Sequence, residues 1–173
     1  EHMAFNGSTN VPEGEMIKLL ERLGLAFGAD TNASTGFEDT IYKLDLPRTD
    51  PDLVDTALML MRETASEILF EQEAVAREIG VIHSEQRVRD TYQQRNAIDQ
   101  LRFLYPGSNF AENWIGGTEE TIANATSQRL RDYYDRWYRP DNAAVIVVGD
   151  FDGEAVEAAI REHFASWQAE PVE

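Results

Sequence analysis

Apolar residues recur at helical spacing along much of the chain. The first such segment follows Pro12 and ends at Gly24, and its apolar positions are Met16, Leu19, Leu20 and Leu23. A second apolar face covers residues 52–69, and a longer helical pattern extends from about residue 71 into the region of Asp99 before Pro106-Gly107 breaks it. We therefore predict three helices here, because side chains three and four positions apart share one helix face.

The N-terminus and the last third of the chain also have helical patterns. Residues 1–5 are typical of the last turn of a helix that stops at Asn6-Gly7-Ser8, since glycine commonly ends a helix. Residues 118–120 and 126–137 predict two short helices, and residues 153–167 predict a last amphipathic helix.

Three segments instead have the composition of strands. Residues 26–35 and 40–46 are joined by Gly36-Phe37-Glu38-Asp39, which suits a hairpin turn. Residues 143–148 form a continuous apolar run, which predicts a strand buried on both faces. Strands and helices mixed without strict alternation predict the α+β class, with helices layered on one face of a mainly antiparallel sheet.

Length and composition suit a folded domain. A chain of 173 residues can bury one sizeable core, so we expect residues 1–173 to form a single domain. Hydrophobic residues make up 42% and charged residues 27%, which is typical of a globular protein and not of a disordered one.

The charge balance narrows the choice of partners. With 32 acidic against 15 basic residues the net charge is -17, which would repel a phosphate backbone and argues against a nucleic-acid partner. The same field would attract cationic peptides, although its simpler consequence is solubility. Cysteine is absent, which excludes disulfides and thiolate zinc sites, and no apolar run approaches the roughly 20 residues that span a bilayer.

Three histidines are candidate ligands: His2, His83 and His163. An isolated histidine is more often structural, and this is our expectation for His83 and His163. His2 differs because it lies in the run EHMAFNG at residues 1–7. This run begins with the second half of the H-x-x-E-H motif of inverzincins.

A second run, FGADTNA at residues 27–33, comes after the first at the spacing of a known family. On both runs the chain resembles the insulinase/pitrilysin family of zinc metallopeptidases, and more closely its bacterial members. The resemblance covers nearly the whole chain. It implies an insulinase-like metallopeptidase domain, Zn²⁺ as the cofactor and hydrolysis of peptide bonds.

The resemblance implies distinct roles for Glu1 and His2. Two histidines four positions apart on a helix can bind one zinc ion, and a glutamate just before the second reaches the water at that ion. His2 is then a zinc ligand, and Glu1 is the general base that takes a proton from the water and passes it to the leaving amine. The first histidine would lie three residues before Glu1. We therefore expect the chain to lack its N-terminal strands and the first half of the motif, and by itself to bind zinc weakly or not at all and to have no peptidase activity.

A third ligand is expected within the run EIGVIHSE at residues 78–85. Seven residues turn a helix by about 700°, so Glu78 and Glu85 share one face. In the family, a glutamate ligand follows a second essential glutamate by seven residues. This implies that Glu85 binds the metal and that Glu78 orients His2 or the nearby loop. Glu78 is the alternative ligand, because the separation from His2 to Glu85 is a few residues longer than in the best-known members. A solvated acidic helix face is the simpler interpretation.

Two further segments match the family. Residues 31–35 resemble the edge strand that pairs with extended substrate through backbone hydrogen bonds, which implies substrate contacts for Asn32 and Ala33. An ordinary sheet edge is the alternative for either residue. Tyr133, Trp137 and Tyr138 match the passage from a helix to a strand, and we expect this aromatic cluster to lie in the core.

The preferred hypothesis is a zinc endopeptidase that hydrolyses short or unfolded polypeptides. A peptide is then the substrate, and a second related domain or subunit closes a chamber around it. The alternatives are a noncatalytic scaffold subunit of the same family and an acidic peptide-binding module without a metal. Resemblance to bacterial members favours the periplasm or cell envelope, with the cytoplasm as the other compartment.

Overall fold

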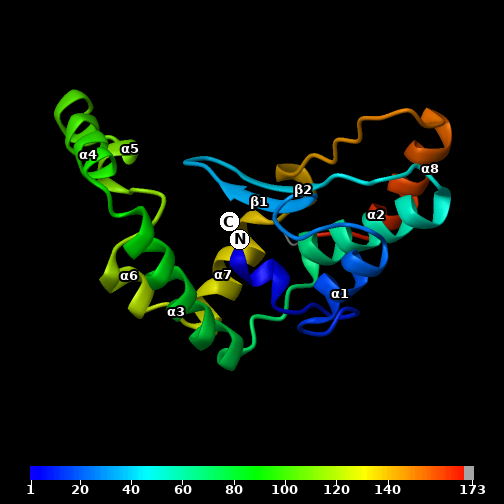
Figure 1. The fold of residues 1–173 in the computed structure, drawn as a ribbon, viewed down its shortest axis with the longest axis horizontal. Coiled ribbons are helices and arrows are strands. Elements are labelled where there is room, and N and C mark those ends of the chain that lie inside the picture. The colour runs from blue at the N-terminus through cyan, green and yellow to red at the C-terminus, as the bar shows by residue number, and fades with distance from the viewer. Residues whose placement is uncertain (170–173) are drawn as a thin grey trace.

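Helices dominate the part of the chain that the computed structural model describes, residues 1–169 (Figure 1). The elements, with η for 3₁₀-helices, are η1 (His2–Phe5), α1 (Glu15–Arg22), β1 (Thr31–Thr35), β2 (Thr40–Leu44), α2 (Pro51–Ser66), α3 (Gln72–Arg89), α4 (Tyr92–Leu104), α5 (Asn109–Glu112), α6 (Glu119–Ala123), α7 (Ser127–Trp137), η2 (Pro140–Asn142) and α8 (Gly153–Phe164). None of these helices is long and apolar enough to cross a membrane.

The prediction of helices layered on a mainly antiparallel sheet is only partly right, because the described residues are mostly helical and their sheet, although antiparallel, is small. They form one two-stranded antiparallel sheet, in which Thr31 lies opposite Leu44 and Thr35 lies opposite Thr40. The apolar run at 143–148 is not a strand. Its side chains are not buried on both faces either, since Ile146 is 82% exposed. A strand needs a neighbour for its backbone hydrogen bonds, and within residues 1–169 this segment has none.

The long helix predicted from residue 71 is two helices, α3 and α4. The break falls at Asp90-Thr91, where the Thr91 side chain accepts a hydrogen bond from the backbone N–H of Gln94 and so caps α4. The other predicted helices are present, with bounds that differ by a few residues. The first residues form a single 3₁₀ turn, η1, and not the end of an α-helix.

Two apolar clusters lie on either side of η1 and fix its position. One joins η1 to the start of α3 and to α7, and its buried members are Met3, Ala4, Ile68, Phe70, Ala74, Val75 and Tyr134. The other joins α1 to α2, and its buried members are Val11, Met16, Leu20, Leu25, Leu53 and Leu60. Phe5 packs against both clusters, so the short segment that carries His2 is fixed from two sides.

The prediction of an aromatic core at Tyr133, Trp137 and Tyr138 is only partly right. Tyr133 is 59% exposed and Trp137 is 49% exposed, whereas Tyr134 is buried and Tyr138 packs against the cluster around it. The inward face of α7 carries Leu130, Tyr134 and Tyr138, at the four-residue spacing of one helix face. Tyr133 and Trp137 lie one position off that face.

Figure 1 shows how these elements are arranged. Helices α1, α2 and α8 lie on one side, and α8 packs on α2. Helices α3 to α6 extend away on the other side, and the β1–β2 hairpin points toward the α4–α5 end of that extension. Helix α3 contacts η1, which brings the two segments with candidate ligands together.

Candidate active site

The imidazole of His2 lies between the carboxylates of Glu78 and Glu85. Its Nδ1 is 2.7 Å from Glu78 Oε1, and its Nε2 is 3.4 Å from Glu85 Oε2. Both glutamates come from α3, whose seven-residue spacing turns them toward η1. The structure therefore brings His2 against two glutamates that lie more than 70 positions away in the sequence.

The spacing of His2 and Glu85 suits a shared metal ion. Zinc bonds to nitrogen and carboxylate oxygen at about 2.0–2.2 Å with tetrahedral angles, which puts two ligand atoms about 3.4 Å apart. The distance from His2 Nε2 to Glu85 Oε2 has this value. Within residues 1–169 no group of three His, Cys, Asp or Glu side chains is placed to hold a metal. His2 Nε2 and Glu85 Oε2 are the two candidate ligand atoms of the described site.

Glu78 is engaged through both of its oxygens. Oε1 contacts His2, and Oε2 accepts a hydrogen bond of 3.2 Å from the amide of Asn6, which also donates to the backbone carbonyl of His2. A carboxylate on Nδ1 holds that nitrogen protonated and leaves Nε2 as the coordinating atom. These contacts favour Glu85 over Glu78 as the ligand.

Glu85 is held by an ion pair on its other side. Arg89, one helical turn further along α3, places Nη2 2.6 Å from Glu85 Oε1. This leaves Oε2 directed at His2. The carboxylates of Glu78 and Glu85 surround the His2 imidazole, and Glu1 precedes His2 in the sequence. Arg89 is the cation that pairs with Glu85. The resulting excess of negative charge suits a divalent cation.

Glu1 connects the motif segment to the sheet. Its carboxylate accepts a hydrogen bond from the hydroxyl of Thr35, the last residue of β1. The candidate general base is therefore exposed and lies beside the end of the strand where a substrate is expected.

The strand β1 has one edge free of other strands in the described part of the chain. Asn32 is exposed and Ala33 is half-buried. The Asn32 side chain donates to the carbonyl of Gly28 at 3.4 Å and accepts from the backbone N–H of Ala33 at 2.9 Å. Both residues predicted to contact substrate thus lie on a sheet edge that ends at Glu1.

A buried carboxylate fixes the loop after η1. Glu63 of α2 is 3% exposed and accepts hydrogen bonds from Ser8 Oγ at 2.6 Å, Asn10 N at 2.9 Å and Asn10 Nδ2 at 2.7 Å. Burial opposes its ionised form, but the bonds from Ser8 and Asn10 outweigh this and hold the pKa of Glu63 below its ordinary value.

Two tyrosines form a protonated pair near the site. The hydroxyls of Tyr42 and Tyr138 lie 2.7 Å apart. Burial raises the pKa of Tyr42, and the neighbouring Tyr138 and the charge on Glu1 raise it further. Burial also raises the pKa of Tyr138. Neither tyrosine is therefore a source of negative charge at neutral pH.

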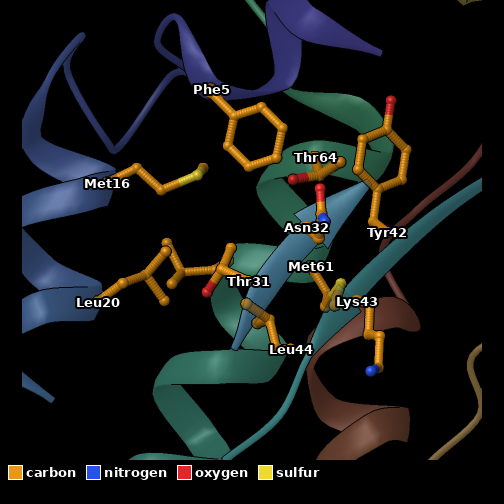
Figure 2. A pocket seen from close by; sticks show the side chains of 11 residues that line it. Phe5, Met16, Leu20, Thr31, Asn32, Tyr42, Lys43, Leu44, Met61 and Thr64 are labelled. Carbon is orange, nitrogen blue, oxygen red and sulfur yellow. The ribbon is translucent and has the colours of Figure 1, made fainter. Parts of the chain in front are cut away.

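A small pocket lies beneath the hairpin, between α1 and α2, and contains none of the candidate ligands (Figure 2). Its lining is mainly apolar: Phe5, Met16, Leu20, Thr31, Asn32, Tyr42, Lys43, Leu44, Leu60, Met61 and Thr64. The hydroxyl of Thr31 is buried there, and it is the one buried side-chain polar atom within residues 1–169 without a hydrogen-bond partner. We assign this pocket to packing under the sheet and not to chemistry.

Sequence reasoning does not single out Asn6, Thr35 or Arg89. The sequence presents Asn6 only as part of a helix stop, and Thr35 only as part of a strand. Arg89 has a signal that could have identified it, because a cation four residues after Glu85 on one helix is positioned to pair with it. Of the other histidines, His163 of α8 contacts Asp55 of α2 at 2.7 Å.

Comparisons with known proteins identify the family of this chain. Residues 1–103 match the family model described as "Insulinase (Peptidase family M16)", and residues 124–173 match "Peptidase M16 inactive domain". The chain is 35% identical over 165 residues to "Probable zinc protease PqqL" of Haemophilus influenzae, covering 95% of this chain and 18% of that protein.

Solved structures show the same fold. The periplasmic protease PqqL of Escherichia coli superimposes with a TM-score of 0.92 at 32% identity, covering 100% of this chain and 20% of that one. The ferredoxin protease FusC, solved in complex with Arabidopsis ferredoxin, superimposes with a TM-score of 0.91 at 26% identity, covering 99% of this chain and 19% of that one. The chain therefore spans about a fifth of the length of these three proteins.

Proposed function

The chain belongs to the insulinase family of peptidases, family M16, and we propose that it forms the metal-binding part of a zinc endopeptidase acting on short or unfolded polypeptides. One observation carries this proposal: His2 presents Nε2 to Glu85 at a ligand-to-ligand distance while Glu78 holds Nδ1. The naming of the similar proteins as zinc proteases supports it. The E. coli relative is a periplasmic protease, which supports the same compartment here.

His2 and Glu85 would hold the zinc, and the family motif would supply a further histidine three positions before Glu1. Zinc at this site would supply Lewis acidity, which lowers the pKa of water and polarises a peptide carbonyl. Glu78 keeps the His2 ring in the tautomer that coordinates through Nε2. Glu1 takes the proton released by the attacking water and returns it to the leaving amine.

Strand β1 would position the substrate. An extended peptide added to its free edge makes backbone hydrogen bonds, which fit many sequences because they do not involve side chains. Asn32 and Ala33 lie along that edge, and the hydrogen bond between Thr35 and Glu1 places the base beside it. A second related domain or subunit would close the chamber over the peptide.

The test is peptide cleavage by a protein that carries this chain together with the first motif histidine. Glu1→Gln should lower kcat by at least about a hundredfold while zinc content stays unchanged, because a positioned general base contributes about 10²–10⁴ in rate. Glu13→Gln is the matched control, since Glu13 is an exposed carboxylate paired with Arg77. Undiminished cleavage by the Glu1→Gln variant would contradict the proposal.

The alternative is a noncatalytic scaffold subunit of the same family. A scaffold would show no cleavage and no zinc even with the first histidine present. The assay above therefore separates the two functions.

A further inference from the structure

The β1–β2 hairpin ends in an aromatic cluster that it shares with α5 and the loop after it. The ring of Phe37, in the hairpin turn, lies 4.9 Å from Phe110 and 6.0 Å from Trp114, in both cases edge to face. Phe37 is 41% exposed and Phe110 is 42% exposed. The cluster is thus a partly exposed aromatic surface that another side chain can contact.

Both sides of this cluster are tied to the candidate active site. Phe37 follows by two residues Thr35, whose hydroxyl donates to Glu1. Trp114 precedes by two residues Gly116, whose carbonyl accepts a hydrogen bond of 2.8 Å from Gln86, the neighbour of Glu85. The cluster therefore has a fixed position relative to both the base and the ligand.

The distance along the strand sets which substrate residue would meet the cluster. Two residues of extended chain span about 7 Å. A peptide paired with the free edge of β1, with its cleaved bond beside Glu1, would place the side chain about two positions from that bond next to Phe37. Aromatic rings and large apolar side chains pack well on such a surface, and small or charged ones gain little.

We propose that Phe37, Phe110 and Trp114 form a substrate subsite that selects an aromatic or large apolar residue about two positions from the cleaved bond. This inference rests on the proposed function, because it requires a peptide on β1. It adds a sequence preference to a backbone-pairing mode that by itself has little.

The experiment measures binding of short fluorescent alanine-rich peptides to the 173-residue chain, with alanine, leucine or phenylalanine at one guest position moved along the peptide. At one position the phenylalanine peptide should bind about tenfold more tightly than the alanine peptide, the size of effect that one aromatic contact supplies. Phe37→Ala and Phe110→Ala, on separate elements, should each reduce this ratio to about two without changing the affinity for the alanine peptide. Phe103→Ala, on the exposed surface of α4, is the matched control and should keep the full ratio.

Two results would overturn the inference. Equal binding of all peptides by the unaltered chain, or a preference that survives both variants, rejects the subsite and leaves strand pairing intact. Absence of binding for every peptide rejects the subsite together with the strand-pairing part of the proposed function. Cleavage that depends on Glu1 is measured separately and fails or succeeds independently of either result.

Discussion

Removing the carboxylate of Glu63 tests how the loop after η1 is fixed. Glu63→Ala leaves Ser8 and Asn10 without their acceptor. Hydrogen bonds to a charged group contribute about 1.5–3 kcal/mol each, and Asn10 is exposed enough to regain water, so we expect a loss of about 3 kcal/mol in the free energy of unfolding. For a chain of this length, that lowers the Tm by about 6–12 °C.

The assay is urea unfolding followed by circular dichroism, with Glu67→Ala as the matched control. Glu67 is the residue just after α2, and it accepts hydrogen bonds from Thr9 and Ser66 and pairs with Arg62 at 3.4 Å. Its side chain is 34% exposed, so its loss should cost only about 1 kcal/mol. Equal destabilisation by the two variants would refute the reasoning that burial makes Glu63 important.

The same carboxylate predicts a pH dependence. The folded pKa of Glu63 lies below its ordinary value of 4.5, so the stabilisation from its ionised form is present above that pH and is lost as the pH falls through the folded pKa. The stability difference between the unaltered chain and Glu63→Gln should therefore be constant near neutrality and shrink below about pH 4.5. A difference that persists undiminished in acid would contradict ionisation as its source.

Three further outcomes are expected. Gly7→Ala should destabilise the chain by about 1–2 kcal/mol, because φ is +106° and a Cβ would lie 3.1 Å from the backbone nitrogen of Glu13. Gly14 is the control: its φ is +79° and a Cβ there would have no atom within 4 Å. In thermal unfolding, Gly14→Ala should therefore cost less than half as much stability as Gly7→Ala. Thr31→Val should raise the free energy of unfolding by about 1 kcal/mol, since it removes a buried hydroxyl without a partner, and a loss of stability would show that the hydroxyl is satisfied in solution. Folding raises the pKa values of Tyr42, Tyr134 and Tyr138, so the folded state favours their protonated forms. The stability that they contribute is complete below the ordinary pKa of 10.0 and declines above it. The urea midpoint should therefore fall between about pH 9 and pH 11, and it should fall less in Tyr42→Phe.

The local features of this fold could be predicted from the sequence, and the long-range ones could not. Helices α1, α2, α7 and α8 follow from apolar spacing, and the hairpin follows from its turn residues. Residues 143–148 have the composition of a buried strand, but the neighbour that a strand requires is not a property of the segment itself. The Thr91 side chain caps α4 and so ends the preceding helix, but the helical pattern of the sequence continues through this position. The pattern therefore does not show that the side chain replaces the backbone of a continuing helix as hydrogen-bond partner.

The candidate site also has features that the sequence predicts and features that only the packing determines. The shared face of Glu78 and Glu85 follows from their seven-residue spacing on one helix. Which nitrogen of His2 meets which carboxylate depends on how η1 packs on α3, and this only the structure shows. The contact of Asn6 with Glu78 and that of Thr35 with Glu1 join segments far apart in the chain, so no spacing rule points to them.

The most direct test of the account is zinc binding by this chain extended at its N-terminus by a short helical segment ending in His-Xaa-Xaa before Glu1. We predict one zinc per extended chain, little zinc in the unextended chain, and loss of stoichiometric zinc in His2→Ala and Glu85→Gln. Glu78→Gln should retain zinc with an affinity about 10–100-fold weaker, as expected for a partner that only orients a ligand. Zinc bound equally well by the extended chain and its Glu85→Gln variant would contradict the assignment of the site.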